Sequence, residues 1–161
     1  MLSPEFEGRD DVTVLRVGTL SKTLGALGGF VAGPRRYTDL LVNRARAYIF
    51  TTASSPADAA AALAALRVLR SPEGDALRAR LHANVDRLRP GHPSPVVPYV
   101  CGSETRALEA ADALAAQGFL VTAIRPPTVP PGTSRLRVAL SADRTFDQID
   151  ALAAALAKLF P

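Results

Sequence analysis

The stretch Gly18–Gly33, which reads GTLSKTLGALGGFVAG, decides how the rest of the chain is interpreted. It contains Lys22, one of only two lysines among nineteen basic residues; the other is Lys158. An amine can lose its proton and attack a carbonyl group, whereas an arginine stays protonated. The glycines allow close backbone approach, and the hydroxyl of Thr19 could meet a phosphate oxygen. Lys22 is therefore a candidate for an imine-forming residue, with a glycine-rich surface loop as the open alternative.

The residues on either side of this stretch favour a turn between two strands. Val12–Val17 is rich in β-branched residues and predicts a buried strand that leads into Gly18. Phe30–Ala32 predicts a short returning strand. The stretch does not have the spacing of a phosphate-binding Walker A loop, since no Gly-Lys-Ser/Thr follows a spaced glycine. We expect a lysine turn at the edge of a sheet.

Composition is typical of a globular protein of 161 residues, with 48% hydrophobic and 21% charged residues. The single cysteine, Cys101, excludes an internal disulfide, predicts a small core residue and favours a reducing compartment such as the cytoplasm. No stretch approaches the length of a membrane span, and the polar residues 1–11 predict a loop.

The net charge of +4 permits a nucleic-acid interpretation, but the arrangement of the charges argues against it. Arginines alternate with acidic residues along the predicted helices, and no basic block interleaved with aromatic residues occurs. We expect no nucleic-acid partner. His82 and His92 have no partner at metal-ligand spacing, so we expect no metal site.

The middle of the chain predicts helices. Arg35–Phe50 is amphipathic, Ala57–Leu69 is rich in Ala and Leu and should be well buried, and a third helix should follow Ser71 and run to about Leu88. The proline-rich run Arg89–Pro98 predicts a connector to a separate layer.

After this connector the pattern changes to a small α+β unit of order β-α-β-loop-β-α. The predicted elements are the strands Val96–Cys101, Phe119–Ile124 and Leu136–Leu140 and the helices Ser103–Gln117 and Thr145–Phe160.

Two features of this unit are candidates for ligand binding. The loop Arg125–Thr133 is dense in prolines, which suits either a rigid ligand wall or a stiff connector. Arg135 and Arg137 lie in the last predicted strand, and a guanidinium can hold a carboxylate through two parallel hydrogen bonds. We expect these two side chains to point to opposite faces, one toward a ligand and one into solvent; an edge-strand charge pair is the alternative.

The segment TLSKTLG followed by GGFVAG resembles the cofactor-lysine segment of the α-oxoamine synthases, which are fold-type I enzymes that use pyridoxal 5′-phosphate. The resemblance extends from about Val12 to the last predicted helix. Within it, the run AIRPPTVP at 123–130 is most similar to the member of this family that acts in biotin biosynthesis.

The resemblance implies an acyltransferase that condenses L-alanine with pimeloyl-CoA or a pimeloyl-carrier-protein thioester and releases carbon dioxide. Lys22 matches the lysine that holds the cofactor and transfers a proton, and Thr19 matches a threonine that contacts the cofactor phosphate. Thr52 matches a hydroxyl that reaches the phosphate of the neighbouring subunit, which implies a homodimer with a shared site. Arg137 matches the arginine that holds the substrate carboxylate, and Thr128 a threonine that contacts substrate.

In this family the cofactor lysine lies well past the middle of the chain, whereas here it is residue 22. The chain therefore resembles the C-terminal part of an α/β fold-type I transferase. Residues 1–56 would end the large cofactor-binding domain, residues 57–92 would form connecting helices, and residues 93–161 would form the small domain.

The family's groups that stack on the cofactor ring and pair with its nitrogen lie upstream of this lysine. We therefore expect the isolated chain to be inactive and to expose apolar helix faces such as Ala57–Leu69. Two alternatives remain open: an inactive remnant that serves only as a dimerisation or interaction surface, and an α-oxoamine synthase that uses glycine.

Overall fold

A computed structural model of the protein describes residue 9 and residues 11–160, and it divides into two compact units, Met1–Ser71 (unit 1) and Pro72–Pro161 (unit 2). Most of the loop expected at residues 1–11 lies outside the described residues. The division of the chain into segments 1–56, 57–92 and 93–161 stays a prediction. No helix in the described part of the chain is long and apolar enough to cross a membrane.

Unit 1 is built on an antiparallel pair of short strands, with Val17 opposite Val31. Its first strand is shorter than predicted, beginning at Arg16 rather than Val12, and the predicted helix Arg35–Phe50 is broken where Ala45 takes an extended conformation (ψ 100°). Its elements are β1 (Arg16–Thr19), β2 (Gly29–Ala32), α1 (Arg35–Arg44), α2 (Arg46–Ile49) and α3 (Pro56–Leu69).

Unit 1 exposes most of its apolar side chains. Among its described residues only Ala26 is buried, and α1 and α3 contribute no buried residue. The prediction that Ala57–Leu69 is well buried is therefore wrong here, because Leu63 is 49% and Leu66 39% exposed. A two-stranded sheet offers too little apolar surface to cover these helices. The expectation that this helix would expose an apolar face is confirmed.

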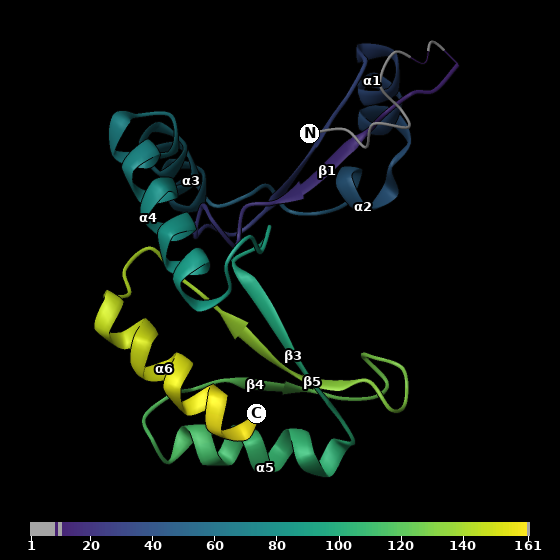
Figure 1. Ribbon diagram of the computed structural model, residues 1–161. Helices are drawn as coiled ribbons and strands as arrows, with labels where there is room; N and C mark the ends of the chain where they lie inside the picture. The colour runs from purple at the N-terminus through teal and green to yellow at the C-terminus, as the bar shows by residue number, and fades with distance from the viewer. Residues whose placement is uncertain (1–8, 10, 161) are drawn as a thin grey trace. The chain divides into compact units, whose positions relative to one another are not determined.

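Unit 2 has the predicted β-α-β-loop-β-α order after its first helix. Its sheet is antiparallel with strand order β3-β5-β4, and α5 and α6 cover one face of it (Figure 1). The strand predicted at Phe119–Ile124 is shorter and begins at Thr122. The elements are α4 (Pro72–Leu88), β3 (Val96–Gly102), α5 (Glu104–Ala115), β4 (Thr122–Ile124), β5 (Ser134–Ala139) and α6 (Phe146–Leu159).

Unit 2 has a continuous hydrophobic core between its sheet and its helices. The middle strand β5 contributes Leu136, which is fully buried, and Val138, which is 2% exposed; they pack with residues such as Leu114 of α5 and Leu156 of α6. Both helices are capped as expected for their sequences. Ser103 accepts a hydrogen bond from the amide of Arg106, and Thr145 forms a capping box with Gln148. Cys101 belongs to this core, and burial raises the pKa of its thiol, as expected for a structural cysteine.

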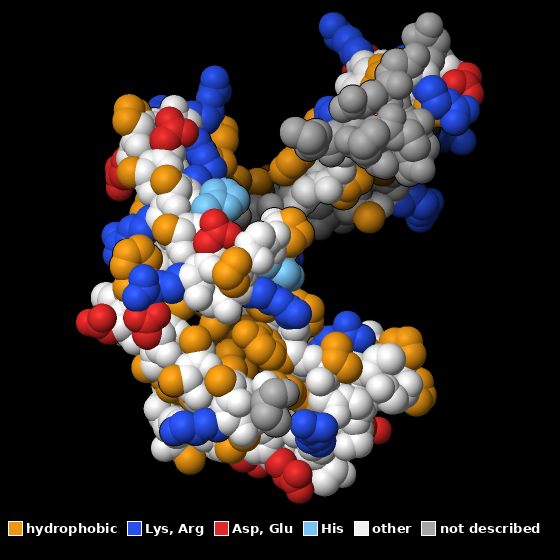
Figure 2. Space-filling view, in the orientation of Figure 1, with side chains coloured by type: hydrophobic (Ala, Val, Ile, Leu, Met, Phe, Trp, Pro, Cys, Tyr) orange, Lys and Arg blue, Asp and Glu red, His pale blue; other side chains and the backbone are white. Residues whose placement is uncertain are grey.

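Polar side chains attach α4 to the rest of unit 2. The side-chain nitrogen (Nδ2) of Asn84, a fully buried residue, donates to the carbonyl oxygens of Ser141 (2.9 Å) and Arg144 (3.1 Å) just before α6. Arg87 forms a two-pronged ion pair with Asp150 of α6, with N···O distances of 2.5 and 2.6 Å. Elsewhere the basic side chains lie scattered over the face seen in Figure 2 rather than in one block.

The contrast between Leu114 and Leu120 gives a test of where the core lies. Leu114→Ala should lower the free energy of unfolding of unit 2 by about 2–5 kcal/mol, because it leaves a cavity at a fully buried position. Leu120→Ala, at a side chain that is 98% exposed, should change it by no more than about 0.5 kcal/mol. Urea unfolding followed by far-UV circular dichroism measures both. Equal losses in the two variants would contradict this core.

The Arg87–Asp150 pair should make stability depend on pH in the acid range. The hydrogen bonds from Arg87 lower the pKa of Asp150 below its unfolded value, so the pair stabilises the fold above that unfolded value. The contribution is lost as the pH falls through the folded-state pKa. Asp150→Asn should therefore be less stable than the parent at neutral pH, and the difference should vanish in strong acid. Both carboxyl and guanidinium are about half exposed, so the effect should be small.

Thermal unfolding at a series of pH values measures this difference. Asp112→Asn, which replaces an exposed carboxylate on α5, is the matched control and should follow the parent at every pH. A difference for Asp150→Asn that persists unchanged in acid would contradict the role of the ion pair.

Candidate functional site

The loop that carries Lys22 joins β1 to β2 and is closed by its own backbone. The amide of Leu20 donates to the oxygen of Gly28 (3.0 Å), that of Ala26 to the oxygen of Leu20 (3.0 Å), and that of Gly25 to the oxygen of Lys22 (3.1 Å). Gly25 and Gly28 have φ values of 58° and 128°, which residues with a side chain rarely adopt. The side chain of Lys22 is exposed on this folded-back loop, so its amine can reach a small molecule.

Hydroxyl groups lie beside the lysine. The Oγ1 of Thr19 is 2.7 Å from the Oγ of Ser21 and accepts a hydrogen bond from the Ser21 amide (3.2 Å). These groups place two hydroxyls and an amine within four consecutive residues. Such a donor set suits a phosphate group next to an aldehyde. Ser21 was not identified as a site residue from the sequence, although its position next to Lys22 was a signal that could have found it.

Two glycines at the base of the loop have close neighbours where a side chain would begin. A Cβ added to Gly29 would lie 2.9 Å from the backbone oxygen of Gly18, and one added to Gly18 would lie 2.5 Å from the ring of Phe30. The close approach of the two strands therefore depends on glycine at position 29, where the obstacle is backbone, whereas a side chain at position 18 would displace the half-exposed ring of Phe30.

A hydrogen bond connects the lysine loop to the start of α3. The amide of Leu27 donates to the carboxylate of Asp58 (3.4 Å), which lies in the first turn of that helix. The segment leading into α3 contains Thr52, an exposed residue of the same unit as Thr19 and Lys22. Asp58 is a second residue that sequence reasoning missed, since nothing in its spacing linked it to the loop.

The remaining predicted site residues, Thr128 and Arg137, belong to unit 2. Thr128 lies in the proline-dense loop between β4 and β5, where its amide donates to the oxygen of Arg125 (3.0 Å). This loop contains a cis peptide bond between Pro126 and Pro127, and near its end the hydroxyl of Thr133 donates to the oxygen of Pro130 (2.7 Å). Both Thr128 and Arg137 are exposed.

Arg135 and Arg137 lie on the same face of the sheet, and the prediction of opposite faces was wrong. Residues two apart on a strand point the same way, so the residue between them, Leu136, occupies the core face instead. On the other face Arg137 lies between Pro98 and Thr122 of the flanking strands. Arg135 is half-buried and its Nε donates to the oxygen of Thr133 (2.9 Å). The face away from α5 and α6 thus carries two guanidiniums.

The described residues contain no group of His, Cys, Asp or Glu side chains that could hold a metal ion. The chemistry that these residues can offer is that of an exposed amine beside hydroxyls in unit 1 and of two guanidiniums on an open sheet face in unit 2.

Comparison with known proteins identifies a matching family model and relatives that are similar to most of this chain. Residues 3–156 match the family model of aminotransferase class I and II. The chain is 51% identical over 150 residues to the 8-amino-7-oxononanoate synthase of Methylorubrum populi, a match that covers 91% of this chain and 39% of that protein.

Solved structures show the same fold. A serine palmitoyltransferase from S. paucimobilis with a bound PLP–myriocin aldimine has a TM-score of 0.82 and 28% identity, over 90% of this chain and 39% of that one. The 8-amino-7-oxononanoate synthase of Francisella tularensis has a TM-score of 0.76 and 28% identity, over 90% of this chain and 45% of that one. The chain therefore spans about two fifths of the length of these relatives.

Proposed function

Because the chain belongs to the aminotransferase class I and II family, we propose that it is the cofactor-lysine and small-domain portion of an 8-amino-7-oxononanoate synthase. The full-length enzyme would be a pyridoxal-phosphate-dependent acyltransferase that joins L-alanine to a pimeloyl thioester, with loss of carbon dioxide, in biotin biosynthesis. The observation that carries this proposal is the exposed amine of Lys22 on a glycine-closed loop, beside the hydroxyls of Thr19 and Ser21. The 51% identity to a synthase of this name supports the choice of substrates.

The residues of the lysine loop fit pyridoxal phosphate by the chemistry of their donors. When bound, this cofactor supplies a conjugated ring that accepts the electrons of a carbanion at the amino-acid α-carbon. Lys22 would hold the cofactor through its Nζ and then move a proton at that α-carbon. Thr19 would donate its hydroxyl to the cofactor phosphate, and we add Ser21 as a second hydroxyl within reach of the same group, since the two oxygens are 2.7 Å apart.

Substrate recognition is assigned to unit 2. Arg137 would bind the carboxylate of L-alanine, because an exposed guanidinium on an open sheet face can present two parallel N–H groups to it. Thr128 would contact the substrate from the proline-dense loop, whose turns are closed by hydrogen bonds such as that from Thr133 to Pro130. A loop that is already ordered loses little conformational freedom when a ligand binds.

We also propose an oligomeric state, a domain organisation and a cellular location. Thr52 would reach the cofactor phosphate of a neighbouring subunit, which gives a homodimer with a shared site. Residues 1–56 would end the large domain, residues 57–92 would form the connecting helices, and residues 93–161 would form the small domain. We propose a cytoplasmic location, in keeping with the single buried cysteine.

Cofactor capture by Lys22 can be tested without turnover. We define the complementing fragment as the part of the Methylorubrum populi synthase that lies outside the 150 matched residues, expressed as a separate chain. A mixture of this fragment, the 161-residue chain and pyridoxal phosphate should develop the visible absorbance of protein-bound cofactor. Lys22→Ala should abolish that band, because the attacking amine is gone. Lys158→Ala, which removes the other lysine, an exposed residue of α6, is the matched control and should leave the band unchanged.

An unchanged band in Lys22→Ala would refute the assignment. A stable dimer with no cofactor uptake, even with the fragment present, would favour a remnant that serves only as an interaction surface. Release of carbon dioxide from glycine rather than from L-alanine would favour a glycine-using member of the family. The chain alone should show no turnover, because it spans only about two fifths of its relatives.

A further inference from the structure

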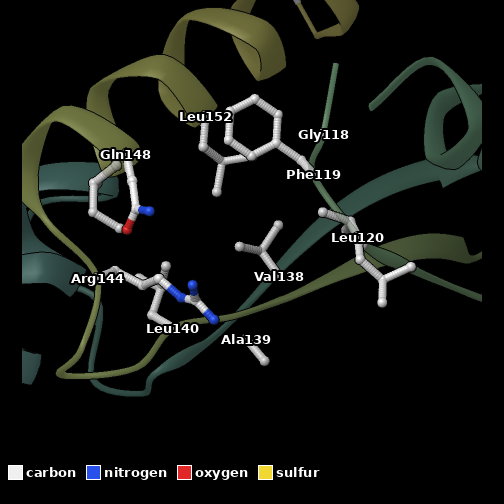
Figure 3. A pocket seen from close by; sticks show the side chains of 11 residues that line it. Gly118, Phe119, Leu120, Val138, Ala139, Leu140, Arg144, Gln148 and Leu152 are labelled. Carbon is white, nitrogen blue, oxygen red and sulfur yellow. The ribbon is translucent and has the colours of Figure 1, made fainter. Parts of the chain in front are cut away.

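The sheet face of unit 2 that α5 and α6 leave uncovered carries two arginines at neighbouring positions. Arg135 and Arg137 point to this face because Leu136, which lies between them, is fully buried on the other. Figure 3 shows the same alternation at the end of β5, where Val138 points toward α6 and Ala139 points the other way. The Cα atoms of residues two apart on a strand are separated by about 6.7 Å. The two guanidiniums therefore belong to one surface.

The sheet supplies no acidic side chain to balance these guanidiniums. Residues 96–102 and 122–139, which form the sheet and its proline-dense loop, contain no Asp or Glu. In the described part of the chain neither arginine forms an ion pair. Arg135 is nevertheless half-buried, and a partly buried cation beside a second cation is electrostatically unfavourable. An anionic ligand would relieve this repulsion.

One hydrogen bond holds Arg135 in place. Its Nε donates to the oxygen of Thr133 (2.9 Å), which directs the guanidinium toward the end of the proline-dense loop. This bond leaves both Nη groups of the planar fork available to a ligand. Thr128, which we assign to substrate contact, lies in the same loop. A ligand that begins at Arg137 and runs along β5 toward the loop would therefore pass Arg135.

Apolar side chains lie beside Arg135 on the same face. The residues opposite it are Val100 of β3 and Ile124 of β4, and Val100 is 59% exposed. Residues directly opposite each other on paired strands share a face of the sheet. These surroundings suit a ligand that carries a carboxylate on a chain of methylene groups.

A small hollow beside β5 is a poorer match for a ligand with two negative charges. It has a volume of about 290 Å³ and lies at the end of β5, next to α6 (Figure 3). Arg144 is the only charged side chain among the described residues that line it. One guanidinium pairs with one carboxylate, whereas the open face of the sheet presents two.

We propose that Arg135 and Arg137 form one site for two carboxylates. Arg137 would hold the carboxylate of L-alanine, and Arg135 the free carboxylate at the far end of the pimeloyl chain, whose methylene groups would lie against Val100 and Ile124. Arg135 would thus select acyl donors that end in a carboxylate over those that end in a methyl group. This inference rests on the proposed function, since the acyl donor is the pimeloyl thioester of that reaction.

The spacing of the arginines agrees with such a ligand. Pimelate, the free seven-carbon dicarboxylate, places its carboxyl carbons about 7–8 Å apart when extended, close to the separation of the two Cα atoms. When the α-carbon of L-alanine meets the thioester carbonyl, the two carboxylates are about 10 Å apart at full extension. The long side chains of the arginines can adjust to either distance.

Binding of pimelate to the 161-residue chain tests the site without cofactor or turnover. Isothermal titration calorimetry at low ionic strength compares pimelate with two other anions. Heptanoate has the same number of carbons but one carboxylate, and the carboxylates of malonate are too close together to reach both arginines. Pimelate should bind with a dissociation constant about 3- to 10-fold lower than either, because it engages the second guanidinium.

Substitutions at Arg135 locate the second carboxylate. Arg135→Met removes the charge but keeps an unbranched side chain, and it should raise the dissociation constant of pimelate to that of heptanoate. Arg135→Lys keeps a cation that can still donate to Thr133 but loses the two-pronged geometry, so it should give an intermediate value. Arg80→Met, at an exposed arginine of α4, is the matched control and should bind pimelate as the parent does. Far-UV circular dichroism checks that each variant is folded.

Three outcomes overturn the inference: equal affinities for pimelate and heptanoate in the parent chain, a preference for pimelate that survives unchanged in both Arg135 variants, and binding of malonate as tight as that of pimelate. The absorbance of protein-bound cofactor reports separately on Lys22. A Lys22-dependent band with no preference for pimelate would overturn this inference and leave the proposed function standing. A preference for pimelate that depends on Arg135, with no such band, would support the two-carboxylate site and overturn the cofactor assignment.

Discussion

The alternation of side chains along β5 governs unit 2. One face of this middle strand must supply the core with Leu136 and Val138, which are almost completely removed from water. The period of two then forces Arg135 and Arg137 onto the other face together. A shift of register by one residue would bury two guanidiniums and expose two core side chains, which would cost far more than the strand gains from pairing. The requirement to bury Leu136 therefore also fixes the face of the sheet on which Arg135 and Arg137 lie.

The structure of unit 1 depends on hydrogen bonds rather than on a buried core. It holds the residue on which the proposed chemistry depends, yet it buries a single described side chain. Its local order comes from backbone hydrogen bonds in the lysine loop and from the close approach of Gly18 and Gly29, not from a core. Hydrogen bonds that stay exposed to water contribute little net stability. The shape of the lysine loop is thus specified by its own sequence, whereas its persistence must depend on surfaces that cover the apolar side chains around it.

Much of this could be predicted from the sequence, because the signals were local. Pro56 and Ser103 mark helix starts through capping and proline geometry, and the glycines around Lys22 require a folded-back loop. The predictions from sequence were wrong where contacts with distant parts of the chain determine burial or helix length. The burial of Ala57–Leu69 depends on a partner layer, and the break at Ala45 interrupts an apolar stripe that looks continuous. The position of Arg135 could have been predicted from strand periodicity alone. Asp58 could not, since its contact with Leu27 joins residues far apart in the chain.

The buried amide of Asn84 carries a consequence for how motion could pass through unit 2. Its side-chain nitrogen donates hydrogen bonds to the carbonyl oxygens of Ser141 and Arg144, and so links the turn before α6 to α4. That turn also holds the guanidinium at the rim of the small hollow beside β5. A movement of α4 would therefore be passed to the backbone of Arg144 through these two hydrogen bonds. Asn84 thus couples the position of α4 to that of the turn that carries Arg144.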